Sequence, residues 1–489
     1  MGTNNTKQAA WVALASLFQL GFSIVSAMIL SRYFDKIEYG TYKQVLYIYS
    51  IIVGMFTLGL PKAYSYFLPR SPINEAKSIM RKISRLFYIL GFILALLLFF
   101  GSGIIAKILN NPDLSEMLKI FSPVPFFLLP TLGLQSILVT YQRSHLMSVY
   151  VILTSVANLL FIVLPVLLWG FGCREALIGF NIGAIVTFIC ALYLKNKPVR
   201  GQPNDPTDQT YRDIFRFTLP LFIATIWGTL INATDQFFIS HFFGTEVFAE
   251  FSNGAMELPF VGMILGSTSA VLTPFFSKKV KEGGDMRKEI LPVWNSAFAK
   301  SAMLIYPITI FCLFEAKDIM TLMYGELYAN SADFFRIKLF TYFIKIITFY
   351  SIIVALGATQ FYQRVHFWYL IVLVSLELLA VYLFQEPLLI TAIHVLLSII
   401  SSIVFIWYIA KRFSTSLCSM FPIAIIAKVL LLSILICLFI IAIKSVSYNT
   451  QPTIITLLID TIIFAICLLT LSIPLKINYI SIIRPLLSK

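Results

Sequence analysis

The chain has 489 residues, of which 59% are hydrophobic and 12% are charged, and its formal net charge is +14. Ordinary soluble domains are about half apolar and about a quarter charged, so this composition excludes a soluble globule and indicates a polytopic membrane protein. The positive charge does not call for nucleic acid as a partner, because loops that face anionic lipid account for most of the excess.

Apolar runs of about 20 residues, the length a helix needs to cross the hydrocarbon core, recur along the whole chain. The weak alternation over about ten residues that marks an outer-membrane barrel is absent. We therefore predict an all-α fold with about fourteen transmembrane helices. Their centres are expected near Gly21, Gly54, Leu96, Leu129, Ile162, Ala184, Trp227, Gly262, Leu304, Ile346, Val374, Leu397, Ile434 and Phe464.

The basic residues predict the orientation of these helices. If the N-terminus is cytoplasmic, the connections on that side carry clusters such as Arg81, Lys82 and Arg85, whereas those on the other side carry fewer lysines and arginines. Both termini are therefore expected in the cytoplasm. The cysteines and histidines show no metal-ligand spacing, so we expect no metal, cofactor or disulfide framework.

A local pattern occurs twice. Residues 30–42 read LSRYFDKIEYGTY, and residues 239–251 read the similar ISHFFGTEVFAEF. Six predicted spans separate the copies, so both face the same side of the membrane, as in parallel transporter repeats. Polar stripes at helical spacing precede each copy. They comprise Ser16, Gln19, Ser23 and Ser26 in the first and Thr225, Gly228, Asn232 and Asp235 in the second.

The repeat predicts the domain organisation. Residues 1–194 form an N-terminal six-helix lobe, residues 195–213 a hydrophilic cytoplasmic linker and residues 214–410 a second six-helix lobe. Residues 411–489 add helices 13 and 14 and a cytoplasmic tail. The linker reads KNKPVRGQPNDPTDQTYRD, with prolines and alternating charges that are typical of a flexible connection.

Two stretches resemble the Wzx-type oligosaccharide flippases. Residues 30–70, LSRYFDKIEYGTYKQVLYIYSIIVGMFTLGLPKAYSYFLPR, are similar to the opening of that family, with its basic residue, a Tyr-Gly turn and a second helix that ends near GLP. Residues 215–254, FRFTLPLFIATIWGTLINATDQFFISHFFGTEVFAEFSNG, are similar to its seventh helix. The match covers about the first three hundred residues, and the remainder agrees in the number and spacing of spans. The two copies differ in chemistry: Asp35 of the first corresponds to Gly244 of the second, and Arg32 corresponds to His241. It therefore does not follow that the two copies have the same role.

The resemblance implies a two-lobed transporter of the superfamily that includes multidrug exporters and lipid II flippases. It also implies a cargo, a polyprenyl-pyrophosphate-linked oligosaccharide that moves from the cytoplasmic to the outer leaflet of a bacterial inner membrane, for O-antigen or capsule assembly. Membrane lipids and a coupling proton or sodium ion are the other expected partners, and the chain is expected to act as a monomer.

A pyrophosphate that crosses a low-dielectric layer needs cations along its path. Lys62, Lys345 and Arg70 are the candidate substrate-binding cations of the cavity. For Lys62 and Arg70 an interfacial position at a helix end is the alternative. Lys428 and Asp460 are a possible structural ion pair within the last two spans.

The acidic and polar residues of the repeat are candidates for a cavity stripe or for ion coupling, because coupled transporters need carboxylates whose ion affinity changes between states. The alternative is hydrogen bonding between helices of one lobe. These candidates are Ser23, Ser26, Asn232, Asp235, Glu250, Asn253 and Glu257.

Two rival functions stay open at the level of sequence. A membrane enzyme of glycan assembly is disfavoured because no long outer loop carries an activating His or Arg motif, so we expect a protein that is not an enzyme. A cation-coupled multidrug exporter of the same superfamily needs an acidic, aromatic pocket, which Asp235, Glu250 and Glu257 favour, whereas Lys62 and Lys345 favour the flippase.

Overall fold

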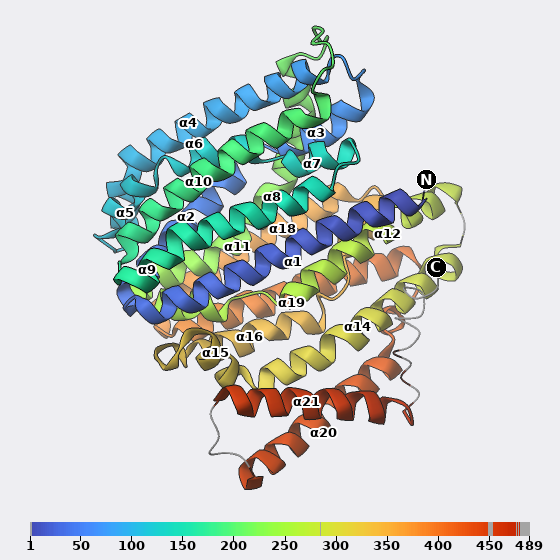
Figure 1. Cartoon of the computed structure of the whole chain (residues 1–489). Helices are drawn as coiled ribbons and strands as arrows, with labels where there is room; N and C mark the ends of the chain where they lie inside the picture. The colour runs from blue at the N-terminus through green and yellow to red at the C-terminus, as the bar shows by residue number, and fades with distance from the viewer. Residues whose placement is uncertain (1, 284, 448–452, 476, 478, 480–489) are drawn as a thin grey trace. The chain divides into compact units, whose positions relative to one another are not determined.

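The computed structural model describes residues 2–283, 285–447, 453–475, 477 and 479, and within them every regular element is helical (Figure 1). Twelve of the described helices are long and apolar enough to cross a membrane, or 13 if the bent pair Tyr211–Ile223 and Thr225–Gly254 is one span. The predicted all-α polytopic fold is confirmed.

The chain divides into two compact units, residues 1–249 and residues 250–489. The predicted lobes 1–194 and 214–410, the linker 195–213 and the appended region 411–489 are not tested by this division and stay predictions. The first unit contains α1 (Gly2–Tyr33), α2 (Lys36–Phe56), α3 (Pro61–Phe67), η1 (Leu68–Arg70), α4 (Ala76–Ile108), α5 (Leu114–Phe121), α6 (Val124–Leu128), η2 (Leu129–Thr131), α7 (Leu134–Thr140), α8 (His145–Asn158), η3 (Leu159–Val163), α9 (Leu164–Trp169), α10 (Cys173–Asn196), η4 (Lys197–Val199) and most of α11 (Tyr211–Gly254).

Several spans of the first unit are interrupted, and proline explains where. The second span ends as α2 at Phe56 and resumes as α3 at Pro61, after Leu58 and Gly59 take positive φ values of 48° and 71°. Proline lacks an N–H and therefore begins a helix without losing a hydrogen bond. In the fifth span Pro165 follows a π-helical turn, η3, in which the Leu164 N–H donates to the Leu159 carbonyl.

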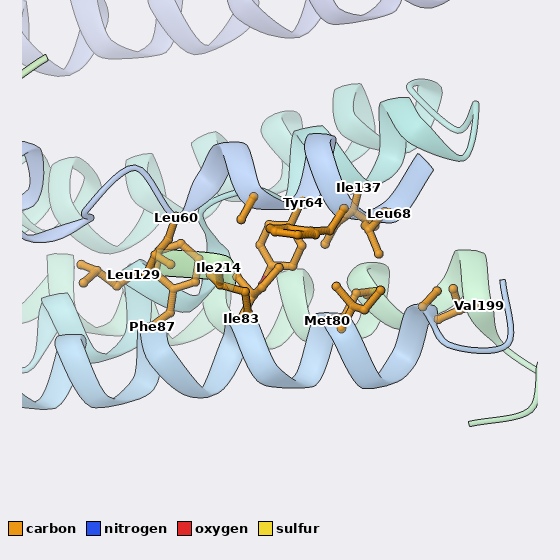
Figure 2. Close-up of a cluster of buried hydrophobic side chains, with 14 of the residues drawn as sticks. Leu60, Tyr64, Leu68, Met80, Ile83, Phe87, Leu129, Ile137, Val199 and Ile214 are labelled. Carbon is orange, nitrogen blue, oxygen red and sulfur yellow. The ribbon is translucent and has the colours of Figure 1, made fainter. Parts of the chain in front are cut away.

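A buried cluster around Tyr64 joins α3 to its neighbours. Figure 2 shows Tyr64 between Ile83 of α4 and Ile137 of α7. The ammonium of Lys195 is buried beside it and donates to the Tyr64 hydroxyl at 2.7 Å, to the Ser84 hydroxyl at 2.7 Å and to the Pro130 carbonyl at 3.4 Å. These neutral acceptors fill the three donors of the ammonium, so Lys195 holds α3, α4 and the fourth span together.

Small residues bring the second span close to α11. A Cβ at Gly54 would lie 2.9 Å from Thr229 Cγ2, one at Gly59 would lie 2.9 Å from the Thr218 carbonyl oxygen, and one at Gly40 would clash with Thr245. Close backbone approach at small residues is a main source of helix association in membranes. Side chains add polar contacts: Gln44 Nε2 donates to Ser240 Oγ at 2.7 Å, and the Tyr47 hydroxyl donates to the Ala233 carbonyl at 2.9 Å.

The second unit follows the break at Gly244, where φ is 83° and ψ is 177°. Its tenth predicted span, centred near Ile346, is not one continuous helix, because residues 344–348 lie outside regular helix. The unit contains α12 (Pro259–Glu282), α13 (Met286–Glu289), α14 (Leu291–Phe314), α15 (Ala316–Tyr324), η5 (Glu326–Tyr328), α16 (Ser331–Leu339), η6 (Phe340–Phe343), α17 (Phe349–Ala355), α18 (Thr359–Leu383), α19 (Pro387–Arg412), η7 (Cys418–Met420), α20 (Ile423–Ser447) and α21 (Thr453–Ser472).

An ion cluster fastens α20 and α21 to the rest of this unit. Lys444 Nζ lies 3.0 Å from Glu315 Oε2, 2.6 Å from Asp318 Oδ2 and 3.2 Å from Asp460 Oδ2. The predicted pairing of Asp460 with Lys428 is wrong, because Lys428 Nζ instead donates to the Leu475 carbonyl at 3.2 Å. Burial raises the pKa of the Glu315 carboxyl, and the hydrogen bond from Lys444 opposes that rise.

Replacing Lys444 by Met is expected to destabilise the protein by about 3–5 kcal/mol, because Asp460 is fully buried and would lose its positive partner. The thermal unfolding midpoint of the purified protein in detergent measures this. Lys428→Met is the matched control on the same helix, and Lys444→Met with Asp460→Asn should recover part of the loss. Equal midpoints for Lys444→Met and Lys428→Met would contradict the role of the cluster.

Candidate functional site

A polar cavity of about 510 Å³ lies within the first unit, among α1, α2, α8, α10 and the interrupted fourth span. Its volume falls in the range of small-molecule binding sites. Hydroxyl and amide side chains make up most of its polar lining, and aromatic rings form part of the rest. The polar residues are Gln19, Ser23, Ser26, Thr131, Gln135, Thr154, Ser155, Asn158 and Thr187, and the aromatic ones are Phe22, Tyr39, Tyr42, Tyr150 and Phe180.

Lys43 is the one charged residue among those that line the cavity. It is half-buried on α2, and its Nζ lies 5.2 Å from the centroid of the Tyr39 ring, one helical turn earlier. Apart from this ring contact, the Lys43 ammonium has no partner among the described residues, neither an ion pair nor a hydrogen bond. The cavity therefore carries a single positive charge with no carboxylate to balance it.

Two interruptions of regular helix form part of the cavity wall. The fourth span unwinds between η2 and α7, where Leu132 is extended and Gly133 has a φ of 88°. The π-helical turn η3 contributes Ile162 next to Asn158 at the end of α8. At membrane depth, non-helical backbone is tolerated where protein covers it or where it lines a water-filled space, and π turns are frequent at functional sites. Both features favour a functional site at this cavity.

The α10 helix accommodates the π turn through two glycines. Gly179 has no Cβ and lets the Phe161 carbonyl come close to α10, and Gly183 gives the same room to the Asn158 side chain. A side chain at either position would push α8 away from α10. The glycines thereby fix the wall that carries Asn158 and Phe180.

The predicted cations Lys62 and Arg70 lie outside this cavity, on the exposed side of α3 and η1. Their spacing of eight residues, with Tyr66 midway, places all three on one helical face. The Arg70 guanidinium carbon lies 3.7 Å from the centroid of the Tyr66 ring, and Arg70 Nη1 donates to the Tyr66 carbonyl at 3.0 Å. Tyr66 in turn stacks on Phe217, with 3.9 Å between ring centroids. Stacking pre-orients the guanidinium while leaving other donors open.

The exposed cations and the cavity wall are joined through Tyr64. This ring belongs to the same short helix as Lys62, and it packs directly against Gly133 in the unwound segment of the fourth span. Tyr64 therefore connects the helix of Lys62 to Gly133, a residue that lines the cavity.

Part of the predicted polar stripe of the first copy lies at the cavity. Ser23 and Ser26 both line it, and the Ser26 hydroxyl donates to the Phe22 carbonyl at 2.8 Å. In the second copy Asn232 is exposed on α11, whereas Asp235 is buried, accepts a hydrogen bond from the Gln236 N–H at 2.9 Å and is not among the lining residues.

The remaining predicted residues belong to the second unit. Glu250 is buried and accepts from Asn330 Nδ2 at 3.2 Å, Asn253 is fully buried, and Glu257 is exposed. Lys345 is half-buried in the non-helical segment that follows η6. No group of three His, Cys, Asp or Glu in the described part of the chain is arranged to hold a metal.

Comparison with known proteins identifies the family. Residues 6–280 match the model of the family described as polysaccharide biosynthesis protein. The chain belongs to this family. The lipopolysaccharide biosynthesis protein WzxC of Escherichia coli (strain K12) is 26% identical over 126 residues, which are 25% of this chain and 24% of WzxC. The alignment thus spans about a quarter of that curated relative.

Solved structures share the fold of this polysaccharide biosynthesis family member. The lipid II flippase MurJ in an inward closed conformation superposes with a TM-score of 0.65 at 14% identity, over 96% of this chain and 100% of that one. An inward-facing multidrug resistance MATE transporter of the MOP superfamily gives 0.64 at 13% identity, over 82% and 98%. A MOP transporter from Pyrococcus furiosus described by a binding pocket of reverse polarity gives 0.57 at 13%, over 84% and 95%. At these identities the likeness concerns the fold.

Sequence reasoning missed two lysines of this family member. Lys43 lies one turn after Tyr39 within a candidate membrane span, and a lysine in such a span is a signal for a cavity position. Lys195 looked like part of the hydrophilic linker, yet it is 4% exposed. Its partners come from the second, third and fourth spans, so no local pattern reveals its burial.

Gly133→Ala is expected to destabilise the protein by about 1–3 kcal/mol more than Gly170→Ala, because its new Cβ would clash with the fully buried Tyr64 ring. Gly170 is a matched control, since it also has a positive φ, 63°, but no atom near its Cβ position. Thermal unfolding midpoints of the two purified variants provide the test. Similar midpoints would show that Tyr64 does not constrain the unwound segment.

Proposed function

We propose that this protein is a flippase for a polyprenyl-pyrophosphate-linked oligosaccharide, which it moves from the cytoplasmic to the outer leaflet of a bacterial inner membrane for O-antigen or capsule assembly. Family membership and the partial match to WzxC support a role in surface polysaccharide synthesis. The observation that carries the proposal is the cavity of the first unit. Hydroxyls, amides and aromatic rings, which are groups that bind sugars, line it, and its one charged lining residue is Lys43.

The pyrophosphate of such a cargo needs positively charged side chains that are accessible from water. Lys62 and Arg70 meet this need, because both are exposed on one face of α3 and η1 and Arg70 is held against Tyr66. An arginine that is stacked in advance loses less side-chain entropy when it binds phosphate. Lys345 of the second unit is the third candidate cation in this role.

A cation-coupled multidrug exporter is the competing function, since MATE transporters share the fold. A pocket for cationic drugs needs a carboxylate within reach of the ligand. The lining of the first-unit cavity contains none, and Asp235 and Glu250 are buried among packed helices. The charge of the cavity therefore favours an anionic or neutral cargo over a cation.

The transport cycle follows an alternating-access scheme in this proposal. The two compact units would move as bodies, and the interrupted spans of the first unit would let α3 and the fourth span adjust locally. Asp235, Glu250, Asn253 and Glu257 stay the candidates for coupling to protons or sodium. The excess of basic residues in the connections on the N-terminal side of the membrane predicts cytoplasmic termini. Membrane lipids surround the protein, and a single chain suffices for the scheme.

Lys62→Ala and Arg70→Ala are each expected to reduce surface polymer at least about 10-fold, because a charge-assisted contact to phosphate contributes about 1.5–3 kcal/mol. Complementation of a strain that lacks the gene, with immunoblotting of the polymer, measures export. Lys107→Ala is the control, since Lys107 is an exposed lysine at a span end of the same unit. Full export by both variants, at normal protein levels, would remove these cations from the mechanism.

A further inference from the structure

We infer that the cavity of the first unit binds one sugar residue that carries a carboxylate, so that the oligosaccharide cargo is acidic. This inference rests on the proposed function, because it names the class of oligosaccharide that the flippase carries. It starts from the one charge in the cavity, the ammonium of Lys43, which no carboxylate in the described part of the chain neutralises.

The position of Lys43 calls for an anionic partner. The residue lies in the second turn of α2, within the candidate membrane span Lys36–Arg70, and it is half-buried. An ammonium within a span is costly unless it faces water, an aromatic ring or a counter-charge. Its contact with Tyr39, at 5.2 Å, supplies a weak partner on one side and leaves the cavity side open.

A single ammonium matches a single negative charge. A phosphate ester or pyrophosphate carries more charge than Lys43 alone balances, and the exposed pair Lys62 and Arg70 is better suited to it. Lys43 lies on α2 and lines the cavity, whereas Lys62 lies 19 positions later on α3, beyond the break at residues 57–60 and outside the cavity. The two sites therefore do not hold the same phosphate group, and a separate anionic group of the cargo belongs beside Lys43.

The rest of the lining fits a sugar ring. Gln19, Gln135 and Asn158 offer amides that both donate and accept hydrogen bonds, and the Ser23 hydroxyl does the same. Phe22 and Phe180, which are half-buried in the lining, add aromatic surface against which the apolar face of a pyranose can pack. A carboxylate alone would need no such array, and a lipid chain would leave these polar groups unsatisfied.

The test compares two ligands that differ only in the carboxylate. Methyl β-D-glucuronide and methyl β-D-glucoside are titrated into the purified full-length protein in lipid nanodiscs, and binding is followed by saturation-transfer NMR. We expect the glucuronide to bind about 10-fold or more tightly than the glucoside, as a charge-assisted hydrogen bond predicts. Lys43→Met should remove this preference and Lys43→Arg should retain it. Lys62→Met, which changes the other cation of the same span, should leave the preference intact.

Equal binding of the two glycosides by the native protein would overturn the inference, and so would a preference that survives Lys43→Met. Inorganic phosphate is the third probe, and displacement of the glucuronide by equimolar phosphate would assign Lys43 to a phosphate group instead. Circular dichroism and gel filtration confirm that each variant is folded. Because the titration has no transport step, its failure is distinguishable from failure of the proposed function, which the export assay on Lys62→Ala measures.

Discussion

The hydrocarbon core of a membrane offers no hydrogen-bond partners, and this constraint determines how the first unit is built. A regular helix satisfies its own backbone, so each interruption needs cover from protein or access to water. The gap between α2 and α3 packs through Gly59 against Thr218 of α11, and the π turn η3 packs through Phe161 against Gly179 of α10. The unwound residues before α7 are covered on one side by Tyr64 and open on the other side into the polar cavity. Two of the departures from regular helix therefore form part of the cavity wall.

The same constraint explains why lysines within apolar segments have different roles. Lys195 donates to three neutral oxygens and serves the packing of α3. Lys444 faces three carboxylates and attaches α20 and α21 to Glu315, Asp318 and the helices beside them. Lys43 has only an aromatic ring and faces a cavity. A structural lysine therefore differs from one that is available to a ligand in the number and charge of the groups that contact its ammonium.

The membrane-spanning class, the positions of most spans and the family followed from composition, run length and the motifs around Gly40 and Gly59. Those signals are local, because a span must be apolar over consecutive residues. The interruption around Lys345 was not predicted, since its residues are as apolar as a continuous helix would be. The partner of Asp460 was also misassigned: Lys428 and Lys444 lie on the same helix, and only the rotation and depth of α20 relative to α21 decide which one it meets.

The predicted site residues divide along the same line. Helical spacing predicts that Ser23 and Ser26 share one face, and both residues line the cavity. Helical spacing does not say which face of α11 is packed against other helices, so it could not predict that Asp235 is buried. Lys43 belongs to neither predicted polar stripe, and its neighbours Thr41 and Gln44 are buried in a hydrogen-bonded network with Asn111.

Transfer of a defined cargo by the purified protein tests the central claim most directly. The protein is reconstituted into liposomes with a fluorescent polyprenyl-pyrophosphate-linked oligosaccharide, and a membrane-impermeant quencher reports the fraction in the outer leaflet over time. Our account predicts protein-dependent transfer of this glycolipid and no uptake of the cationic dye ethidium under a proton or sodium gradient. Ethidium transport without glycolipid transfer would contradict it.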